Sequence, residues 1–269
     1  MREQTLSLLK SKLQDYYASY YRDELGLSDW RQRVERRLLE EDFFAAPRIT
    51  WLREWIGLDV AGKSALVVGA GTGAESLALT ASGAKVVAIE PFSKAVEVLS
   101  LRSDISHGPR FLTVRGEGEA LPFSDESFDI IYCFAVLEHT KNPLDCVDEM
   151  LRALAEGGTL FIEVPDYRFP YDGHYKIPWI PFSPQPLVSW YLILLGRPAA
   201  FSRTLRYLSF PMLRRHFNRR GVAFLRYHTP LPDYWRTKSL FWRLIWHLSL
   251  WTGIVPNQTL IVRKIRSGS

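Results

Sequence analysis

A glycine-rich turn follows an apolar run in the first third of the chain. Gly69, Gly71 and Gly73 alternate directly after the run Ala65–Val68, and a helical pattern begins at Ala74. Glycines in a connection from strand to helix let the backbone adopt positive φ and let a ligand approach the main chain closely. The spacing therefore predicts a turn that holds a nucleotide-like cofactor, with a tight turn that binds nothing as the alternative.

A carboxylate ends the next apolar run, about twenty residues after the glycine turn, where an acid can accept hydrogen bonds from both ribose hydroxyls. This residue is Glu90, and its alternative role is to cap the helix that begins near Ser93. Two cofactor classes share this arrangement. The turn matches the dinucleotide pattern G-x-G-x-x-G/A when Ala74 is counted, and the G-x-G-x-G of S-adenosylmethionine enzymes when Gly73 is counted.

Two histidines are the candidates for acid–base chemistry. His139 follows an expected strand at Ile130–Phe134, and His174 follows another at Thr159–Val164. Ligands of open α/β sheets bind beyond the carboxyl ends of the strands, and histidine titrates near neutral pH. Each is therefore expected to act as a general base for a hydroxyl acceptor or to orient that acceptor; a packed or solvent-exposed histidine is the alternative. Glu138 is expected to orient a neighbour or to face water.

Strands and helices alternate through the middle of the chain, which predicts βαβ units and a mostly parallel, doubly wound α/β sheet. The expected strands are Ala65–Val68, Lys85–Ile89, Phe111–Val114, Ile130–Phe134 and Thr159–Val164, joined by helices at about Ala74–Ser82, Ser93–Leu101 and Pro143–Leu154. Before them, helices are expected at Thr5–Tyr21 and Asp29–Asp42. After them come a helix over Ser209–Gly221, strands at Val222–His228 and Thr259–Lys264, and an apolar helix at Ser239–Thr252.

These patterns divide the chain into four expected parts. Residues 1–58 form an N-terminal helical cap, 59–165 the cofactor-binding core, 166–208 a substrate-cap insertion, and 209–269 the C-terminal part of the core with an aromatic helical insertion at about 229–257.

The composition is that of a globular protein, with 47% hydrophobic and 23% charged residues in 269. Cys133 and Cys146 are expected to be reduced thiols and are too few for a zinc ligand set, so we expect no metal. The N-terminal sequence does not match a secretory signal, and no uncharged run reaches the ~18 residues of a membrane span. We therefore expect a soluble, cytoplasmic protein.

Positive charge is concentrated in the last third. Residues 168–269 contain 16 Lys and Arg but only Asp172 and Asp233 as acids, together with six of the nine tryptophans. Three interpretations stay open: arginine stems that pack in a large lid, an anionic acceptor such as a phosphorylated sugar or polyprenyl-linked glycan, or peripheral contact at the inner face of a membrane through Ser239–Thr252 and Trp190–Leu195. Nucleic acid is not expected, because no compact recognition motif is present.

The sequence resembles the class I S-adenosylmethionine-dependent methyltransferases, specifically their small-molecule (methyltransferase type 11-like) branch. The motifs that carry the resemblance are Glu117 before Leu121-Pro122-Phe123, then Ser127-Phe128-Asp129, Leu137-Glu138-His139 and Leu154-Ala-Glu-Gly157-Gly158-Thr-Leu-Phe-Ile162. The resemblance covers about Gly62 to Pro165, with weaker support from Pro211 to Lys264. Glu156 stands where proline is usual, and Glu117-Gly118 where an aspartate and a small residue are usual.

The resemblance implies a seven-stranded, Rossmann-like methyltransferase fold with helical and aromatic cap insertions, and a set of cofactor contacts. Gly69, Gly71 and Gly73 would line the methionine moiety and ribose, and Glu90 would bind the ribose diol. Glu117, with Glu119 as the alternative, would bind the adenine amino group, and the N–H of Gly118 would face the adenine ring. The main chain at Cys133 and Phe134 would flank the methionyl ammonium. It further implies transfer of a methyl group to a small-molecule, glycan or lipid acceptor, with oxygen as the favoured atom. The alternatives are an NAD-type oxidoreductase and a non-catalytic cofactor-binding or peripheral membrane module.

Overall fold

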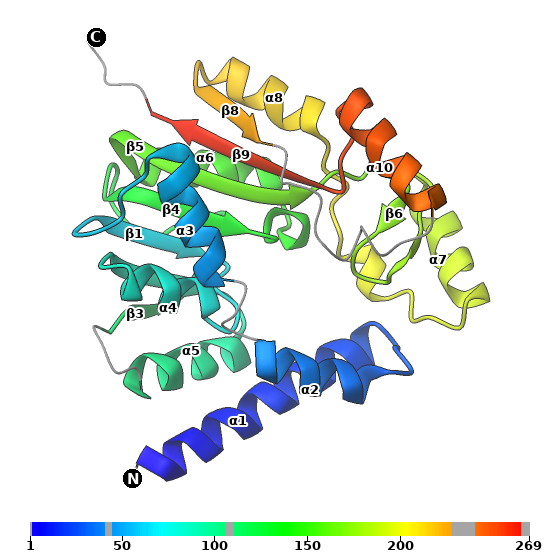
Figure 1. Ribbon diagram of the computed structural model, residues 1–269, viewed down its shortest axis with the longest axis horizontal. Coiled ribbons are helices and arrows are strands. Elements are labelled where there is room, and N and C mark those ends of the chain that lie inside the picture. Colours follow the sequence, from blue (N-terminus) through cyan, green and yellow to red (C-terminus); the bar gives the residue numbers. More distant parts are fainter. Residues whose placement is uncertain (1, 41–44, 106–109, 228–239, 265–269) are drawn as a thin grey trace.

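The computed structural model describes residues 2–40, 45–105, 110–227 and 240–264 (Figure 1). Its centre is a seven-stranded sheet in the order β3-β2-β1-β4-β5-β9-β8. The strands are β1 (Ser64–Val68), β2 (Lys85–Glu90), β3 (Leu112–Arg115), β4 (Phe128–Phe134), β5 (Leu154–Pro165), β8 (Ala223–Tyr227) and β9 (Asn257–Arg263). The first five pair in parallel, while β9 runs antiparallel to both β5 and β8. The predicted mostly parallel, doubly wound fold is confirmed.

Helices cover both faces of this sheet, as Figure 1 shows. They are α1 (Arg2–Ala18), α2 (Trp30–Glu40), α3 (Ala45–Ile56), α4 (Ala74–Ala81), α5 (Ser93–Ile105), α6 (Pro143–Ala153), α7 (Gln185–Leu194), α8 (Phe210–Arg219) and α10 (Leu240–Thr252). Short turns add the π-helix η1 (Ser19–Glu24) and the 3₁₀ turns η2 (Leu137–His139) and η3 (Phe201–Arg203).

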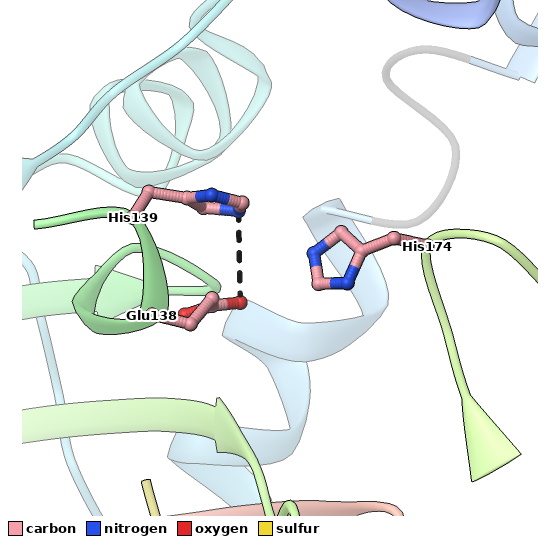
Figure 2. A group of neighbouring side chains, drawn as sticks. All are labelled: Glu138, His139 and His174. Carbon is pink, nitrogen blue, oxygen red and sulfur yellow. Dashed lines mark ion pairs between the residues drawn. The ribbon is translucent and has the colours of Figure 1, made fainter. Parts of the chain in front are cut away.

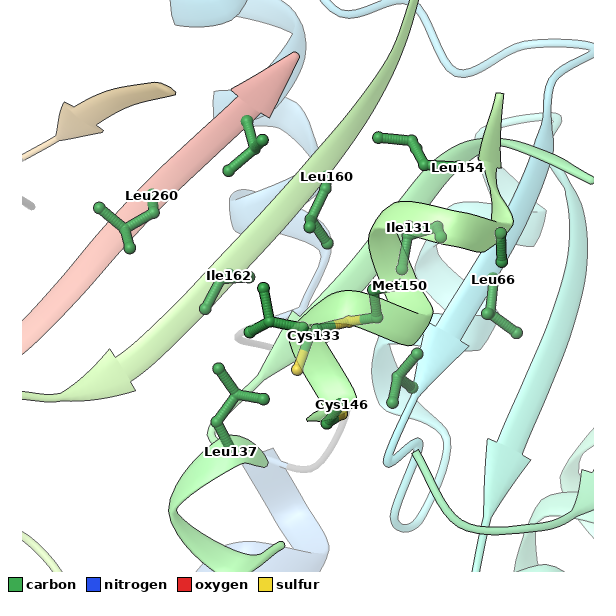
Figure 3. Close-up of a cluster of buried hydrophobic side chains, with 14 of the residues drawn as sticks. Leu66, Ile131, Cys133, Leu137, Cys146, Met150, Leu154, Leu160, Ile162 and Leu260 are labelled. Atoms are coloured by element: carbon green, nitrogen blue, oxygen red, sulfur yellow. The ribbon is translucent and has the colours of Figure 1, made fainter. Parts of the chain in front are cut away.

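Alternate residues of each buried strand enter two different cores, because successive strand side chains point to opposite faces. Leu66 and Ile131 pack with Met150 of α6 and Phe217 of α8, in the core drawn in Figure 3. Their strand neighbours face the other way and pack against α3 and α4 through a second set of residues: Ala65, Val67, Ile130, Tyr132, Leu52 and Leu79. Burial on both faces explains why these strands appear in the sequence as continuous apolar runs.

A smaller hairpin and helix cover the carboxyl end of β5. Strands β6 (Tyr171–Asp172) and β7 (Ile177–Pro178) pair antiparallel, and α7 follows them. The hairpin and α7 were not predicted, since the segment 167–202 carries prolines and aromatics without a clear period. Tyr167, Tyr175 and Trp179 pack there with Leu25 and Phe201 in a separate aromatic core. This core ties the N-terminal helices to the insertion after β5.

Most element boundaries agree with the predictions within three residues. Two differ more: α5 ends at Ile105 rather than Leu101, and β5 begins at Leu154 rather than Thr159. The first helix ends at Ala18 and continues as π-helix η1. Part of the aromatic insertion expected at 229–257 lies outside the described residues, but its helix is present as α10. None of the described helices has the length and apolar character that a membrane crossing requires.

Candidate active site

The glycine turn connects β1 to α4, and its three glycines all have positive φ: 63° at Gly69, 52° at Gly71 and 93° at Gly73. A Cβ at Gly69 would lie 2.4 Å from Val136, and one at Gly73 would lie 2.7 Å from Leu99. A Cβ at Gly71 would have no atom within 4 Å. The outer two glycines therefore allow packing, whereas the middle one borders open space that a ligand can enter.

Glu90 ends β2 beside this turn. Its Oε2 accepts a hydrogen bond of 2.9 Å from the backbone N–H of Gly71, and its Oε1 accepts one of 3.1 Å from Phe92. The residue is buried, and burial raises the pKa of Glu90 although the two amide donors act in the opposite direction. The carboxylate thus lies beside the glycine turn, and its role toward a ribose stays a prediction.

The acids after β3 have separate partners. Glu117 is half exposed, and its carboxylate lies 2.9 Å from Nζ of Lys141. Glu119 accepts hydrogen bonds from the backbone N–H of Lys141 and of Asn142. A Cβ at Gly118 would lie 2.6 Å from Sγ of Cys146. Glu119 therefore binds the chain before α6, whereas Glu117 forms an exposed ion pair with Lys141.

The end of β4 supplies one buried and one accessible residue. Cys133 is fully buried, whereas Phe134 is partly buried and has the guanidinium of Arg48 4.1 Å from its ring centre. Arg48, from α3, also forms an ion pair with Glu75 in the first turn of α4. This cation beside the glycine turn was missed at the sequence level, because Arg48 lies in a helix far from the turn along the chain.

Helix α1 closes against the glycine turn. The hydroxyl of Tyr17 lies 3.0 Å from that of Thr72, and both residues are buried. Tyr20, one turn further on, packs its ring against Phe201, with 5.7 Å between ring centres. The N-terminal helix therefore contacts both the glycine turn and the segment that follows α7.

The structure brings the two predicted histidines together, with Glu138 beside His139 (Figure 2). The rings of His139 and His174 meet edge to face with their centres 5.2 Å apart, and Nε2 of His139 lies 3.9 Å from Oε1 of Glu138. The turn that carries Glu138 and His139 adjoins the glycine turn: the backbone N–H of His139 donates to the carbonyl of Val136, whose side chain lies against Gly69. The interpretation of Glu138 as a residue facing water is wrong, because it is fully buried.

The three side chains differ in charge. Burial raises the pKa of Glu138 to about 7, and neither of its oxygens has a hydrogen-bond partner among the described residues. Partial desolvation and the neighbouring His174 lower the pKa of His139, so its ring is neutral at physiological pH, although 33% of its side chain is exposed. Burial also lowers the pKa of His174, but the Asp172 carboxylate outweighs this, and the net shift is upward.

Asp172 holds His174 in place and was missed as a site residue. Its Oδ1 accepts hydrogen bonds from the backbone N–H of His174 at 2.9 Å and of Tyr175 at 2.7 Å. Its Oδ2 lies 3.6 Å from Nδ1 of His174. The sequence Asp172-Gly173-His174 contained the signal, since an aspartate two residues before a histidine commonly binds that backbone in a tight turn.

Comparison with known proteins identifies the domain that contains this site. A family model described as a methyltransferase domain matches residues 66–162, which include the glycine turn, Glu90, Glu117 and Glu138-His139. The chain carries a class I S-adenosylmethionine-dependent methyltransferase domain. The cofactor of this methyltransferase domain is S-adenosylmethionine. Glu138, His139 and His174 place their possible metal-ligand atoms within 4.8 Å of one another, but the family indicates no metal.

Relatives match mainly over this domain. The chain is 37% identical over 123 residues to a demethylmenaquinone methyltransferase of Clavibacter sepedonicus, with 44% of this chain and 49% of that protein covered. It is 33% identical over 118 residues to a ubiquinone biosynthesis O-methyltransferase of Pseudomonas fluorescens, with 42% and 48% covered. The chain thus spans about half the length of the curated relatives it matches.

Solved structures match over a longer stretch and show the fold of the methyltransferase. The structure of an S-adenosylmethionine-dependent methyltransferase from Mesorhizobium loti superposes with a TM-score of 0.56 at 14% identity, covering 82% of this chain and 99% of that one.

Proposed function

We propose that this protein transfers the methyl group of S-adenosylmethionine to a hydroxyl oxygen of a small molecule. The observation that carries the proposal is the contact between His139 and His174, because the turn that carries His139 packs against the glycine turn through Val136. An oxygen nucleophile gains from a base at this place, and the two named quinone-pathway methyltransferases among the relatives suggest a small aromatic acceptor.

The cofactor pocket is built by residues whose geometry fits an adenosine. The open space at Gly71 admits the ligand, and the Glu90 carboxylate at its edge can accept from the two ribose hydroxyls. Glu117 can accept from the adenine amino group once its ion pair with Lys141 opens. The main chain at Cys133 and Phe134 ends β4 beside these groups, next to the expected position of the methionyl ammonium.

The chemistry that the bound cofactor supplies is an electrophilic methyl on a sulfonium, which leaves as a thioether without help from an acid. Much of the rate of such a displacement comes from alignment of nucleophile and methyl carbon. His139, neutral because burial lowers its pKa, orients the acceptor hydroxyl by hydrogen bonding. His174 takes the proton, since Asp172 raises the pKa of His174 and fixes its backbone.

An anionic acceptor receives less support than it had from the sequence. Several arginines of the last third have structural partners: Arg168 pairs with Asp166, Arg220 with Asp148, and Arg206 donates to the carbonyl of Lys141. These contacts favour the interpretation of arginine as part of a packed lid. We therefore place an uncharged phenol or enol ahead of a phosphorylated glycan.

The test is a methyl-transfer assay with labelled S-adenosylmethionine and a panel of catechols, hydroquinones and phosphorylated sugars. His174→Ala should lower kcat by about a hundredfold or more while the calorimetric affinity for S-adenosylhomocysteine stays unchanged. His139→Ala should raise the KM for the acceptor more than it lowers kcat. Treatment with a chelator should leave turnover intact. Full activity of His174→Ala, or labelling of nitrogen in place of oxygen, would contradict the assignment.

A further inference from the structure

Helix α7 presents an apolar face that nothing in the described structure covers. The helix has no charged residue, and Val188 and Leu192 on one side are buried in the aromatic core. Trp190, Ile193 and Leu194 on the other side are exposed, with Trp190 61% exposed. An uncharged helix with an exposed apolar face is unusual on a protein surface, where such patches mark interaction sites.

Helix α10 repeats this pattern. Trp246 is buried against Phe169. The opposite face carries exposed side chains at helical spacing: Leu240, Leu244, Leu248 and Trp251, the last of them 86% exposed. Exposed Arg243 and His247 lie on the same side of the helix. This composition, with apolar side chains and tryptophan beside a cation, is typical of a helix that lies in the plane of a membrane interface.

The two helices flank one hairpin. Tyr191 of α7 donates a hydrogen bond to the carbonyl of Pro178 in β7, while Trp246 of α10 packs with Phe169 just before β6. Figure 1 shows β6 between α7 and α10 at one end of the molecule. A small hollow of about 70 Å³ opens beside α7, lined by residues that include Trp179, Leu187 and Trp190. The same hairpin carries His174 in its turn.

The charge around these helices suits an anionic surface. In the described part of residues 168–264, Asp172 is the sole acid, and it is buried. Exposed cations in the same region include Lys176, Arg203 and Arg243. Such a surface attracts phosphate headgroups through its cations and offers its apolar side chains to the layer beneath them.

We propose that α7 and α10 together form a docking face for an anionic phospholipid bilayer. On the methyltransferase function proposed above, the docked hairpin would bring His174 close to acceptors that dissolve in the bilayer. The substrate class is then a lipid-soluble phenol or quinol, and the protein contacts the membrane only at its surface.

Flotation with vesicles tests the docking face independently of catalysis. The purified full chain is mixed with one of two kinds of vesicle, at low and at high salt. One kind contains phosphatidylcholine alone, and the other contains phosphatidylcholine with about 30 mol% phosphatidylglycerol. We expect binding to the anionic vesicles, weaker binding at high salt, and little binding to phosphatidylcholine. Trp251→Ala should reduce the bound fraction about tenfold, since one interfacial tryptophan side chain is lost. Leu39→Ala is the matched control, because Leu39 is 87% exposed on α2, away from this face.

Two further measurements separate the explanations. Ile193→Ser tests the α7 side of the face and should also reduce binding to the anionic vesicles, because Ile193 is 65% exposed there. Calorimetry with S-adenosylhomocysteine checks that Trp251→Ala and Ile193→Ser remain folded and keep the cofactor site. Failure to bind either vesicle, or equal losses for Trp251→Ala and Leu39→Ala, would overturn the docking face. A dimeric wild type whose dimer is lost in these variants would overturn it as well, since the face would then bind a second copy of the chain. If the wild-type chain binds the anionic vesicles but does not bind S-adenosylhomocysteine, the result would contradict the proposed function and leave the docking face intact.

Discussion

The Glu90 carboxylate and the backbone N–H of Gly71 lie 2.9 Å apart, 19 residues from each other along the chain. This bond joins the carboxyl ends of β1 and β2 at the point where Gly71 borders open space. One residue therefore gives a ligand access to the backbone, and the other gives it a buried acceptor. The cofactor assignment depends most on this pair.

Gly71→Val should weaken the binding of S-adenosylhomocysteine by about tenfold to a hundredfold, because branched methyl groups would fill the space the ligand uses. Gly62→Val is the control. Gly62 also has positive φ, at 74°, and a Cβ there would have no atom within 4 Å, but it lies before β1. Both variants should lose about 1–2 kcal/mol of stability from backbone strain. Equal affinities of the two variants in calorimetry would count against the pocket.

Glu90→Gln should reduce the affinity for S-adenosylhomocysteine by roughly tenfold, because a charged acceptor for the ribose hydroxyls is replaced by a neutral one. The control is an analogue that lacks the 2′ and 3′ hydroxyls. Wild type and variant should bind this analogue with similar affinity. An equal loss for both ligands would mean that Glu90 supports the turn and does not contact the sugar.

Asp172→Asn should move the acid limb of the pH–rate profile to lower pH. His174 must be neutral to accept a proton, so the rate falls as pH drops through its pKa, which Asp172 holds above the ordinary value of 6.5. Asparagine keeps an oxygen for the backbone N–H groups of His174 and Tyr175 but removes the negative charge, and burial alone then lowers the pKa of His174. A profile of kcat/KM from pH 5 to 9 measures the shift. A limb that stays in place or moves upward would remove His174 as the base.

Glu138→Gln should change the pH dependence of stability. In the folded protein burial raises the pKa of Glu138 from 4.5 to about 7, so the unfolded chain releases this proton at lower pH than the native one. Wild-type stability contributed by the protonated form is complete below pH 4.5 and is lost as pH rises to 7. Glutamine cannot ionise, so the variant should gain roughly 3 kcal/mol relative to wild type between pH 4.5 and 8. Urea unfolding of wild type and variant at pH 4.5 and pH 8 measures the difference in their free energies of unfolding. If this difference is the same at both pH values, Glu138 ionises at its ordinary pKa and the prediction is contradicted.

Local patterns predicted the sheet well, because β1, β2 and β4 are buried over most of their length and are therefore mainly apolar. Glu90 could also be predicted, since its place at the end of β2 follows from the strand and the distance to the glycine turn. The patterns did not separate the glycines: Gly69 and Gly71 look alike in the sequence, but Val136 from another strand connection fills the space at Gly69.

The residues that the sequence could not reveal act through tertiary contacts. Tyr17 meets Thr72 across 55 positions of the chain, and Arg48 meets Phe134 across an even longer interval. For the α7 face, the sequence left a packed lid and a membrane contact as open interpretations. Only the exposure of its side chains shows that Ile193 and Leu194 have no cover in the described structure.

The central claim is that the open space beside Gly71 and Glu90 binds the adenosine of S-adenosylmethionine. Isothermal titration of the full chain with S-adenosylhomocysteine and, separately, with NAD⁺ and NADH tests it most directly. We predict one site per chain with micromolar affinity for S-adenosylhomocysteine and no measurable heat with either dinucleotide. Saturable dinucleotide binding without binding of S-adenosylhomocysteine would contradict the claim.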